Sequence, residues 1–199
     1  MDKEKFLQQA LNIQDEELLT KFAAASKVIH FKKDSLLIKA GDSQEYADIL
    51  VSGILRGFFI DFQGKDITDS FFYQRGDIVM GCHGFNNPAL ISIEALTEGD
   101  VVRIPVPDIS RLLDEYHELS IIYSKILMRA LDKQWKIKNA VYQYSAIDRY
   151  KWFIRSYPEL LHTVPNKYIA SFLNITPVTL SRIKAKLKAS SEQIQKPLM

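Results

Sequence analysis

The sequence predicts an α+β protein that consists of an antiparallel β-roll, one long helix and a C-terminal helix-turn-helix. Three observations predict this class. Short runs of β-branched and aromatic residues alternate with glycine turns between residues 27 and 105. Neither glycine nor proline occurs between residues 108 and 157. Residues 169–183 have the spacing of two short amphipathic helices joined by a tight turn.

Length and composition indicate a globular protein of one large or two modest domains. Of the 199 residues, 47% are hydrophobic and 25% are charged, unlike a disordered or fibrous chain. No apolar run approaches the roughly 20 residues of a membrane helix, and the N-terminus lacks the apolar core of a signal peptide. The single cysteine, Cys82, cannot form an internal disulfide or supply the about four thiolates of an iron–sulfur cluster. A cytoplasmic protein is therefore expected.

The first 105 residues contain a helical pattern followed by strand patterns. Residues 1–26 carry apolar residues at helical spacing, with Asp15, Glu16 and Glu17 where a helix start favours negative charge, and predict two short helices. Eight strands are predicted after them: Val28–Phe31, Leu36–Ile38, Ala47–Val51, Ile54–Asp61, Ile67–Phe72, Asp77–Met80, Leu90–Ala95 and Val101–Ile104. Glycines separate these runs, and eight short strands at this spacing predict a closed antiparallel roll or jelly roll.

After the roll, the lack of glycine and proline predicts helices. An acidic helix from Ile109 to about Tyr116 leads into a long helix from about Leu119 to Tyr144. A helix of about 26 residues spans roughly 39 Å at 1.5 Å per residue, which exceeds what a small roll can cover. One stripe of the long helix is apolar and comprises Leu119, Ile122, Ile126, Ala130, Ile137 and Val141. The stripe could pack on its own domain, but the length of the helix favours the seam of a two-stranded dimer.

Residues 169–183 carry the pattern of a helix-turn-helix. Five apolar side chains are spaced to point into one small core, namely Ile169, Leu173, Ile175, Leu180 and Ile183. Asn174 stands at the corner, where a positive φ must be tolerated. Thr176 can cap the second helix through its hydroxyl, and Pro177 suits the first helical turn because no amide hydrogen is missed there.

The outer face of this helix pair is basic. Thr179, Arg182 and the lysines that follow lie away from the predicted core. Residues 145–199 hold nine Lys and Arg against three Asp and Glu, whereas the preceding residues hold 17 basic and 21 acidic residues. Attraction for an anionic polymer is therefore concentrated in the last quarter of the chain. A helix pair of this kind is the arrangement that enters the major groove of double-stranded DNA.

The order of roll, long helix and helix-turn-helix resembles the Crp/Fnr family of bacterial transcriptional regulators, the cyclic-AMP receptor protein family. The motifs that carry the resemblance are Ala40-Gly41-Asp42, Leu50-Val51-Ser52-Gly53, Gly76-Asp77-Ile78, Ile147-Asp-Arg-Tyr150, Tyr157-Pro-Glu-Leu160, Val164-Pro165, Tyr168–Pro177 and Thr179-Leu-Ser-Arg-Ile183. The C-terminal motifs look like the Bacteroidetes-type variant of the family. This resemblance implies a homodimer that binds a partly palindromic DNA operator and recruits or blocks RNA polymerase.

The resemblance also implies three parts. Residues 1–116 are expected to form a cyclic-nucleotide-binding-like jelly roll, a sensor domain with flanking helices. Residues 117–144 are expected to form the dimerisation helix. A winged helix-turn-helix that binds DNA is expected at residues 145–199.

The predicted DNA contacts follow from the matched positions. Arg182 matches the arginine that reads a guanine, and a guanidinium can bond guanine O6 and N7 together; a solvated helix arginine is the alternative. Thr176, Thr179 and Lys167 match positions that hold backbone phosphates. The rest of the predicted contact set is Ser181, Val178, Lys184 and Lys186, with Lys188 as a further source of nonspecific attraction or of solubility.

Val178 departs from the family, which often has a glutamate at this position. Valine cannot accept a hydrogen bond, although it could touch a thymine methyl. No operator sequence is therefore predicted.

Ordinary cyclic-AMP binding is not expected. The family holds the nucleotide through a Gly-Glu turn and an Arg-Ser pair, but Met80–Gly84 lacks the glutamate and the Arg-Ser positions are Ala89 and Leu90. A cyclic phosphate would lose a charge-assisted, bidentate contact, which only His83 or Arg75 could replace. A pocket for another small effector would comprise Gly76, Met80, Gly81, Ala89 and Leu90. No cofactor is predicted, and the effector is left open.

Two other functional classes are the alternatives to a DNA-binding regulator. A cupin-like metalloenzyme needs a cluster of His and Glu on adjacent strands, and the roll offers only His30 and His83. Cys82 could join His83, but a lone cysteine is more often a small buried hydrophobe, and metal sites need three or four ligands. No catalytic motif stands out, so no enzyme, catalytic residue or metal site is expected. A scaffolding module that has lost DNA binding is the other alternative, and the basic C-terminal quarter opposes it.

Overall fold

The structure is a computed structural model that describes residues 1–82 and 87–194, without the side chains of residues 190–194. The chain divides into two compact units. The first unit comprises residues 1–65 and 69–131, and the second comprises residues 66–68 and 132–199.

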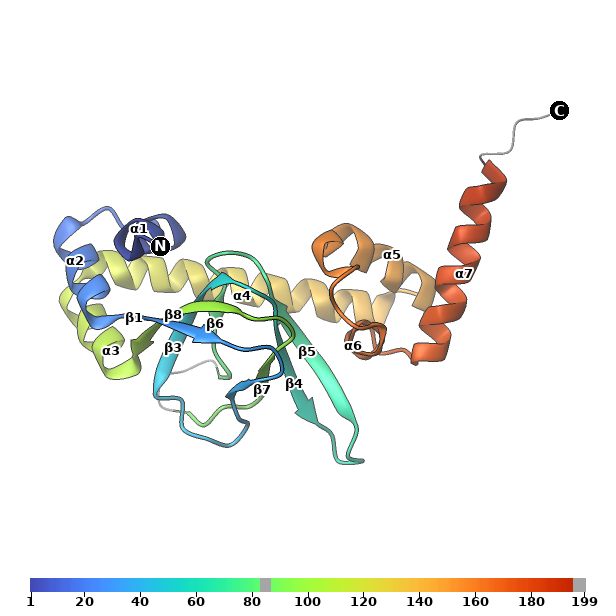
Figure 1. Cartoon of the computed structure of the whole chain (residues 1–199), viewed down its shortest axis with the longest axis horizontal. Helices are drawn as coiled ribbons and strands as arrows, with labels where there is room; N and C mark the ends of the chain where they lie inside the picture. Colours follow the sequence, from blue (N-terminus) through green and yellow to red (C-terminus); the bar gives the residue numbers. More distant parts are fainter. Residues whose placement is uncertain (83–86, 195–199) are drawn as a thin grey trace. The chain divides into compact units, whose positions relative to one another are not determined.

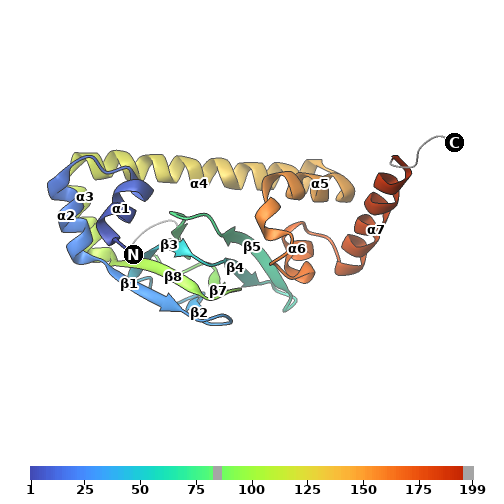
Figure 2. The same cartoon turned by 45° about the horizontal axis from the view of Figure 1, so that its top comes forward.

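Three short helices lie at one end of the roll in the first unit, α1 (Lys3–Leu11), α2 (Glu16–Ala25) and α3 (Val106–Glu115) (Figures 1 and 2). The predicted pair of N-terminal helices is confirmed. Asp15 caps α2, and its carboxylate accepts a hydrogen bond from the Leu18 amide at 2.9 Å. Helix α3 begins three residues before the predicted Ile109 because Pro107 fits its first turn, where no amide hydrogen is needed.

All eight predicted runs form strands. They are β1 (Lys27–Phe31), β2 (Leu36–Ile38), β3 (Tyr46–Ser52), β4 (Leu55–Ile60), β5 (Asp66–Phe72), β6 (Ile78–Val79), β7 (Ser92–Ala95) and β8 (Gly99–Pro105). Two four-stranded sheets result, ordered β1-β8-β3-β6 and β2-β7-β4-β5. The pairs β1–β8, β8–β3, β3–β6, β2–β7 and β7–β4 are antiparallel, as predicted.

Two apolar clusters stabilise the first unit. One joins α1, α2 and α3 to one side of the first sheet, where Ile49 of β3 is opposite Val102 of β8. The other fills the inside of the roll and includes Leu50, Leu55 and Ile93. Consecutive residues Ile49 and Leu50 enter different clusters because successive side chains of a strand point to opposite faces.

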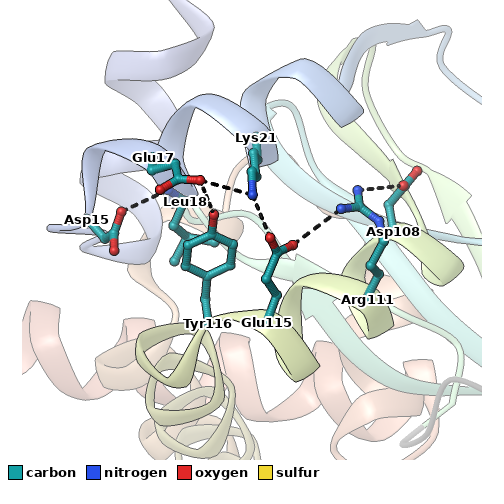
Figure 3. A network of polar contacts seen from close by, with 8 residues as sticks. All are labelled: Asp15, Glu17, Leu18, Lys21, Asp108, Arg111, Glu115 and Tyr116. Atoms are coloured by element: carbon teal, nitrogen blue, oxygen red, sulfur yellow. Dashed lines mark hydrogen bonds and ion pairs between the residues drawn. The ribbon is translucent and has the colours of Figure 1, made fainter.

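A network of polar contacts ties α2 to α3 (Figure 3). The Lys21 ammonium lies 2.6 Å from the Glu115 carboxylate and 3.1 Å from that of Glu17, which also accepts a hydrogen bond from the Tyr116 hydroxyl at 2.9 Å. These contacts raise the pKa of Lys21, chiefly through Glu115, and lower the pKa of Glu17, chiefly through Lys21. Both groups are therefore held in their charged forms.

The long helix α4 (His117–Gln143) has 27 residues, close to the predicted range. Its predicted apolar stripe exists, but the structure turns it toward this chain. Leu119 and Ile122 are 4% and 7% exposed within the first core cluster, and Ile126 packs against that cluster. Further along the helix, Ile137 is buried, Val141 is half-buried and Ala130 is exposed. That this stripe forms a dimer seam stays a prediction, and Leu119 and Ile122 already pack in the core of their own unit.

The other side of α4 is also apolar, and it is exposed. Its large side chains recur at intervals of seven residues, with Ile121 44%, Met128 65%, Trp135 58% and Tyr142 80% exposed. Leu131, which is 63% exposed, lies between Met128 and Trp135 on the same side. A long helix with one buried and one exposed apolar stripe results.

The second unit is helical. Besides residues 66–68 of β5 and the end of α4 from residue 132, its elements are α5 (Ala146–Ser156), the 3-10 turn η1 (Pro158–Leu160), α6 (Asn166–Phe172) and α7 (Pro177–Ile194). Aromatic rings form its centre: Phe153 lies 5.2 Å from Tyr157, and both lie within 6 Å of Phe172, centroid to centroid. These edge-to-face and stacked contacts hold α5 against α6.

Candidate nucleic-acid interface

Helices α6 and α7 form the predicted helix-turn-helix. Of the five predicted core residues, Ile169, Leu173, Leu180 and Ile183 are buried, and Ile175 is half-buried. Ala170, also fully buried, lies in α6. The spacing of the apolar residues was therefore sufficient to locate both helices and their common core.

The turn between α6 and α7 has the predicted backbone. Asn174 adopts a φ of 50°, which asparagine tolerates better than most residues. The guanidinium of Arg149, on α5, donates to the backbone carbonyls of Leu173 at 2.8 Å and Asn174 at 3.2 Å. A cation at the C-terminal carbonyls of α6 is favourable because these groups lack partners inside the helix. Sequence spacing did not predict this role, since Arg149 lies far from the turn along the chain.

The start of α7 matches the prediction in detail. The helix begins at Pro177, and the Thr176 hydroxyl accepts a hydrogen bond from the Thr179 amide at 3.1 Å. The Thr176 and Thr179 hydroxyl oxygens are 2.9 Å apart and hydrogen-bond each other. Both hydroxyls thus fix the first turn of α7.

The outer face of α7 carries the predicted base-reading residue. The side chain of Arg182 is exposed, and among the described residues it has no hydrogen-bond or ion-pair partner. Ser181 is exposed beside it, and Val178, one turn earlier, is 60% exposed. The Arg182 guanidinium is therefore available to a ligand outside the chain.

The lysines near this face differ from one another. Lys184 is half-buried, donates to the Asn166 side chain of α6 and lies 5.7 Å from the centre of the Tyr150 ring of α5. It braces α7 against the other two helices rather than extending outward. Lys167 is exposed and lies 4.6 Å from the Tyr168 ring centre. Lys186 and Lys188 are exposed on α7.

A wing is not found in the described residues that follow the recognition helix. Helix α7 continues to Ile194, and residues 195–199 lie outside the described residues. The stretch from residue 183 to 194 contains no glycine or proline that would end the helix and begin a hairpin. The described part of the chain after Arg182 is therefore helical, and the winged motif stays a prediction.

Of the five residues predicted to line an effector pocket, Gly81, Ala89 and Leu90 lie together, and the Leu90 amide donates to the Gly81 carbonyl at 2.7 Å. Gly76 lies next to α1, Met80 packs against the first core cluster, and Leu90 is 64% exposed. Gly81 and Ala89 do meet, so tightly that a Cβ on Gly81 would lie 2.9 Å from the Ala89 Cβ. The position predicted for the phosphate-binding arginine is thus filled by a buried alanine packed on a glycine.

A buried glutamine, Gln44, hydrogen-bonds the polar groups next to this contact. The Gln44 side-chain oxygen accepts hydrogen bonds from the Gly81 amide at 2.7 Å and from the Cys82 thiol at 3.4 Å, and its amide donates to the Tyr46 carbonyl. Gln44 itself is 7% exposed. The roll therefore satisfies the Gly81 amide with its own side chain. This role could not be predicted from the sequence, because a polar residue in a loop is usually exposed.

Cys82 and His83 are the remaining candidates for metal or redox chemistry. Cys82 is buried, as a small hydrophobe would be, whereas His83 lies outside the described residues. Within residues 1–82 and 87–194, no three His, Cys, Asp or Glu side chains come together as a metal site. In the same ranges, no helix has the length and apolar character needed to cross a membrane.

Comparison with known proteins gives a domain family for the roll. Residues 28–116 match the model of the cyclic nucleotide-binding domain family. That match covers the strands of the first unit and helix α3. A comparison with curated protein sequences finds no match.

Solved structures share the fold of most of the chain. FixK2 from Bradyrhizobium japonicum superposes with a TM-score of 0.74 at 16% identity, over 83% of this chain and 86% of FixK2. The regulator CLP from Xanthomonas campestris, described as c-di-GMP-responsive, gives a TM-score of 0.71 at 14% identity, over 89% and 93% of the two chains. A protein from Eubacterium rectale assigned to the Crp/Fnr family of transcriptional regulators gives 0.73 at 13% identity, over 94% and 88%. At these identities the likeness establishes a common fold.

Proposed function

We propose that the protein is a dimeric transcriptional regulator that binds specific DNA sequences through the helix-turn-helix of α6 and α7. The exposed and unpaired Arg182 is the observation that carries this proposal most directly. An arginine at this place can bond both acceptors of a guanine in the major groove. The fold that the chain shares with Crp/Fnr regulators supports a regulator rather than an enzyme.

The charge distribution supports DNA as the partner. Residues 145–199 contain nine Lys and Arg against three Asp and Glu. Lys167 and Lys186 are exposed around the recognition helix, where phosphates of a bound duplex would lie. Thr176 and Thr179 add hydroxyls at the helix start, and the helix N-terminus itself attracts a phosphate. Lys184, which is engaged with α5 and α6, is better assigned to support of the recognition helix.

The exposed apolar face of α4 is the dimer seam in this proposal. Ile121, Met128, Trp135 and Tyr142 are spaced by seven residues, the repeat that two parallel helices bury between them. An open groove of about 520 Å³ follows Ile121 and Met128 along α4. A contiguous exposed apolar surface on a monomer commonly marks an interface. A dimer also suits a helix-turn-helix protein, because operators present two half-sites.

The roll is proposed as a sensor domain that does not bind cyclic AMP in the ordinary way. Ala89 stands where an arginine would be needed, and Gln44 already occupies the Gly81 amide. A cyclic phosphate would therefore find neither a bidentate cation nor that free amide donor. Contact with RNA polymerase is the further partnership that the regulator role entails.

Selection of genomic DNA fragments tests the proposal. Purified full-length protein is mixed with sheared genomic DNA, with and without cyclic AMP and other candidate effectors, and the bound fragments are sequenced. Wild-type protein is expected to enrich fragments that share a partly palindromic sequence, independently of cyclic AMP. Arg182→Ala is expected to lose this enrichment while keeping its circular dichroism spectrum. Wild-type protein that enriches no common sequence under any condition would contradict the proposal.

A further inference from the structure

Val178 is an apolar residue on an otherwise polar surface. It lies in the first turn of α7, is 60% exposed, and is flanked on the outer face by Thr179, Ser181 and Arg182. The first residues of a recognition helix are the ones that approach base edges. Val178 therefore lies where base contact is made, without a donor or acceptor of its own.

The relation of Val178 to Arg182 is fixed by helix geometry. The two residues are four apart in α7, so their Cβ atoms lie about 5–6 Å apart on the same face. Stacked base pairs are separated by about 3.4 Å. Two side chains with this separation meet base pairs that are one or two steps apart. Whatever Val178 touches is thus a close neighbour of the base that Arg182 reads.

The side chain of Val178 is also rigid. A β-branched residue in a helix occupies essentially one χ1 rotamer, so its two methyl groups are held in a defined direction. The helix start beneath it is fixed by the bonded pair Thr176 and Thr179. Little side-chain entropy is lost when such a group packs against a ligand.

Only one base presents an apolar group in the major groove, namely thymine through its C5 methyl. Against cytosine, adenine or guanine, Val178 would cover a polar atom without replacing its hydrogen bond to water. Given DNA binding as proposed above, on which this inference rests, we propose that Val178 is a specificity-determining residue. It selects a thymine within two base pairs of the guanine read by Arg182, through contact with the thymine methyl.

The test uses deoxyuridine, which lacks only the C5 methyl. Each thymine of a half-site of the selected operator is replaced in turn, in both half-sites together, and the affinity is measured by fluorescence anisotropy. Loss of one buried methyl per half-site is expected to weaken wild-type binding about 15-fold at one position, within two base pairs of the guanine. The remaining thymines are the matched controls and should change affinity less than about twofold.

Two variants separate the contact from other effects of the methyl on DNA shape. Val178→Ala is expected to bind the thymine operator about 15-fold more weakly and to lose most of its response to deoxyuridine at that position. Val178→Thr keeps one methyl in the same direction and should keep part of the response.

Equal responses of wild type and Val178→Ala to every deoxyuridine, with sequence-specific binding retained, would overturn this inference and leave the proposed function standing. Failure of wild-type protein to distinguish the operator from a shuffled duplex would instead overturn the proposed function.

Discussion

Arg149 shows how a single side chain holds the helix-turn-helix together. It reaches the carbonyl of Leu173, 24 positions away in the sequence, and that of Asn174, the residue with positive φ. Its guanidinium therefore stabilises the one backbone conformation on which the angle between α6 and α7 depends.

Substitution of Arg149 should loosen this turn. In Arg149→Met the two carbonyls lose their charged partner, so amides of residues 169–183 are expected to exchange hydrogen faster than in wild type. Hydrogen exchange followed by mass spectrometry of peptides from this segment measures the change. Arg149→Lys should restore part of the protection, since an ammonium can reach one carbonyl.

Arg155→Met is the matched control, because Arg155 is an exposed arginine of the same helix. Unchanged exchange in Arg149→Met would show that the turn is stable without the guanidinium.

Single residues of the interface could be predicted from sequence only where the cause is local. The cap at Thr176, the corner at Asn174 and the start at Pro177 depend on neighbours within a few positions, and all three are confirmed. The bracing role of Lys184 and the clamp by Arg149 depend on contacts between helices. Side-chain spacing along one helix carries no information about them.

At the level of elements, α4 shows that apolar periodicity predicts which face of a helix is buried but not which neighbour buries it. Apolar spacing identified a real stripe through Leu119 and Ile122, but those residues pack on α1 to α3. Periodicity identifies a face that avoids water, not the neighbour that covers it. The opposite face, with Met128 and Leu131, is exposed, and it is the face proposed as the dimer seam.

A charge on this exposed face should prevent association. Leu131→Glu would place carboxylates against each other or against apolar side chains in a dimer, which costs free energy on association and none in the monomer. Wild type is expected to sediment as a dimer at micromolar concentration in analytical ultracentrifugation, and Leu131→Glu as a monomer.

Lys33→Glu provides the control, since Lys33 is exposed in the roll and does not belong to α4. This variant is expected to remain dimeric. Wild type that sediments as a monomer, or Leu131→Glu that stays a dimer, would refute the seam.

The α2 to α3 network predicts a pH dependence of stability (Figure 3). The pKa of Glu17 is lowered in the folded state from its ordinary value of 4.5, chiefly by Lys21 and then by the Tyr116 hydroxyl. Its contribution is therefore present above pH 4.5 and is lost as pH falls through the lowered pKa. The pKa of Lys21 is raised, so its contribution is present below its ordinary value of 10.5 and is lost above the raised one.

Glu17→Gln is accordingly expected to flatten the acid side of the stability profile. Urea unfolding midpoints measured between pH 3 and pH 7 should fall less steeply toward low pH than in wild type. The difference should be small because the group is exposed. Glu16→Gln, at the neighbouring position of α2, should retain the wild-type profile. Identical profiles for wild type and Glu17→Gln would exclude a role of this carboxylate.

For the whole molecule, the division of charge predicts strong salt dependence of DNA binding. Lys186 is exposed on the recognition helix, and a lysine that contacts a phosphate releases a counterion on binding. Lys186→Ala should therefore weaken operator and nonspecific binding alike. It should also reduce the slope of log affinity against log salt by about one for each contact removed.

Lys33→Ala, an exposed lysine of the roll, should leave both the affinity and the slope unchanged. Slopes that are the same in wild type and Lys186→Ala would place this lysine away from the DNA.

The fold of the whole chain could be predicted from the sequence more fully than the contacts inside the roll that decide ligand binding. Order of elements, eight strands and the helix-turn-helix were all predicted, because each leaves a local pattern. The closed contact between Gly81 and Ala89 and the buried Gln44 were not, since both depend on how distant loops meet. The proposed DNA-binding site therefore depends on features that leave a local pattern, whereas the interior of the roll does not.

The most direct test of the proposed DNA-binding site is an anisotropy titration of wild type and Arg182→Ala against the selected operator and a shuffled duplex of equal length. Wild type should prefer the operator by about a thousandfold or more. Arg182→Ala should lose about 1–3 kcal/mol of operator binding per half-site and little binding to the shuffled duplex. Equal affinity of wild type for both duplexes, or an unchanged preference in Arg182→Ala, would contradict the account.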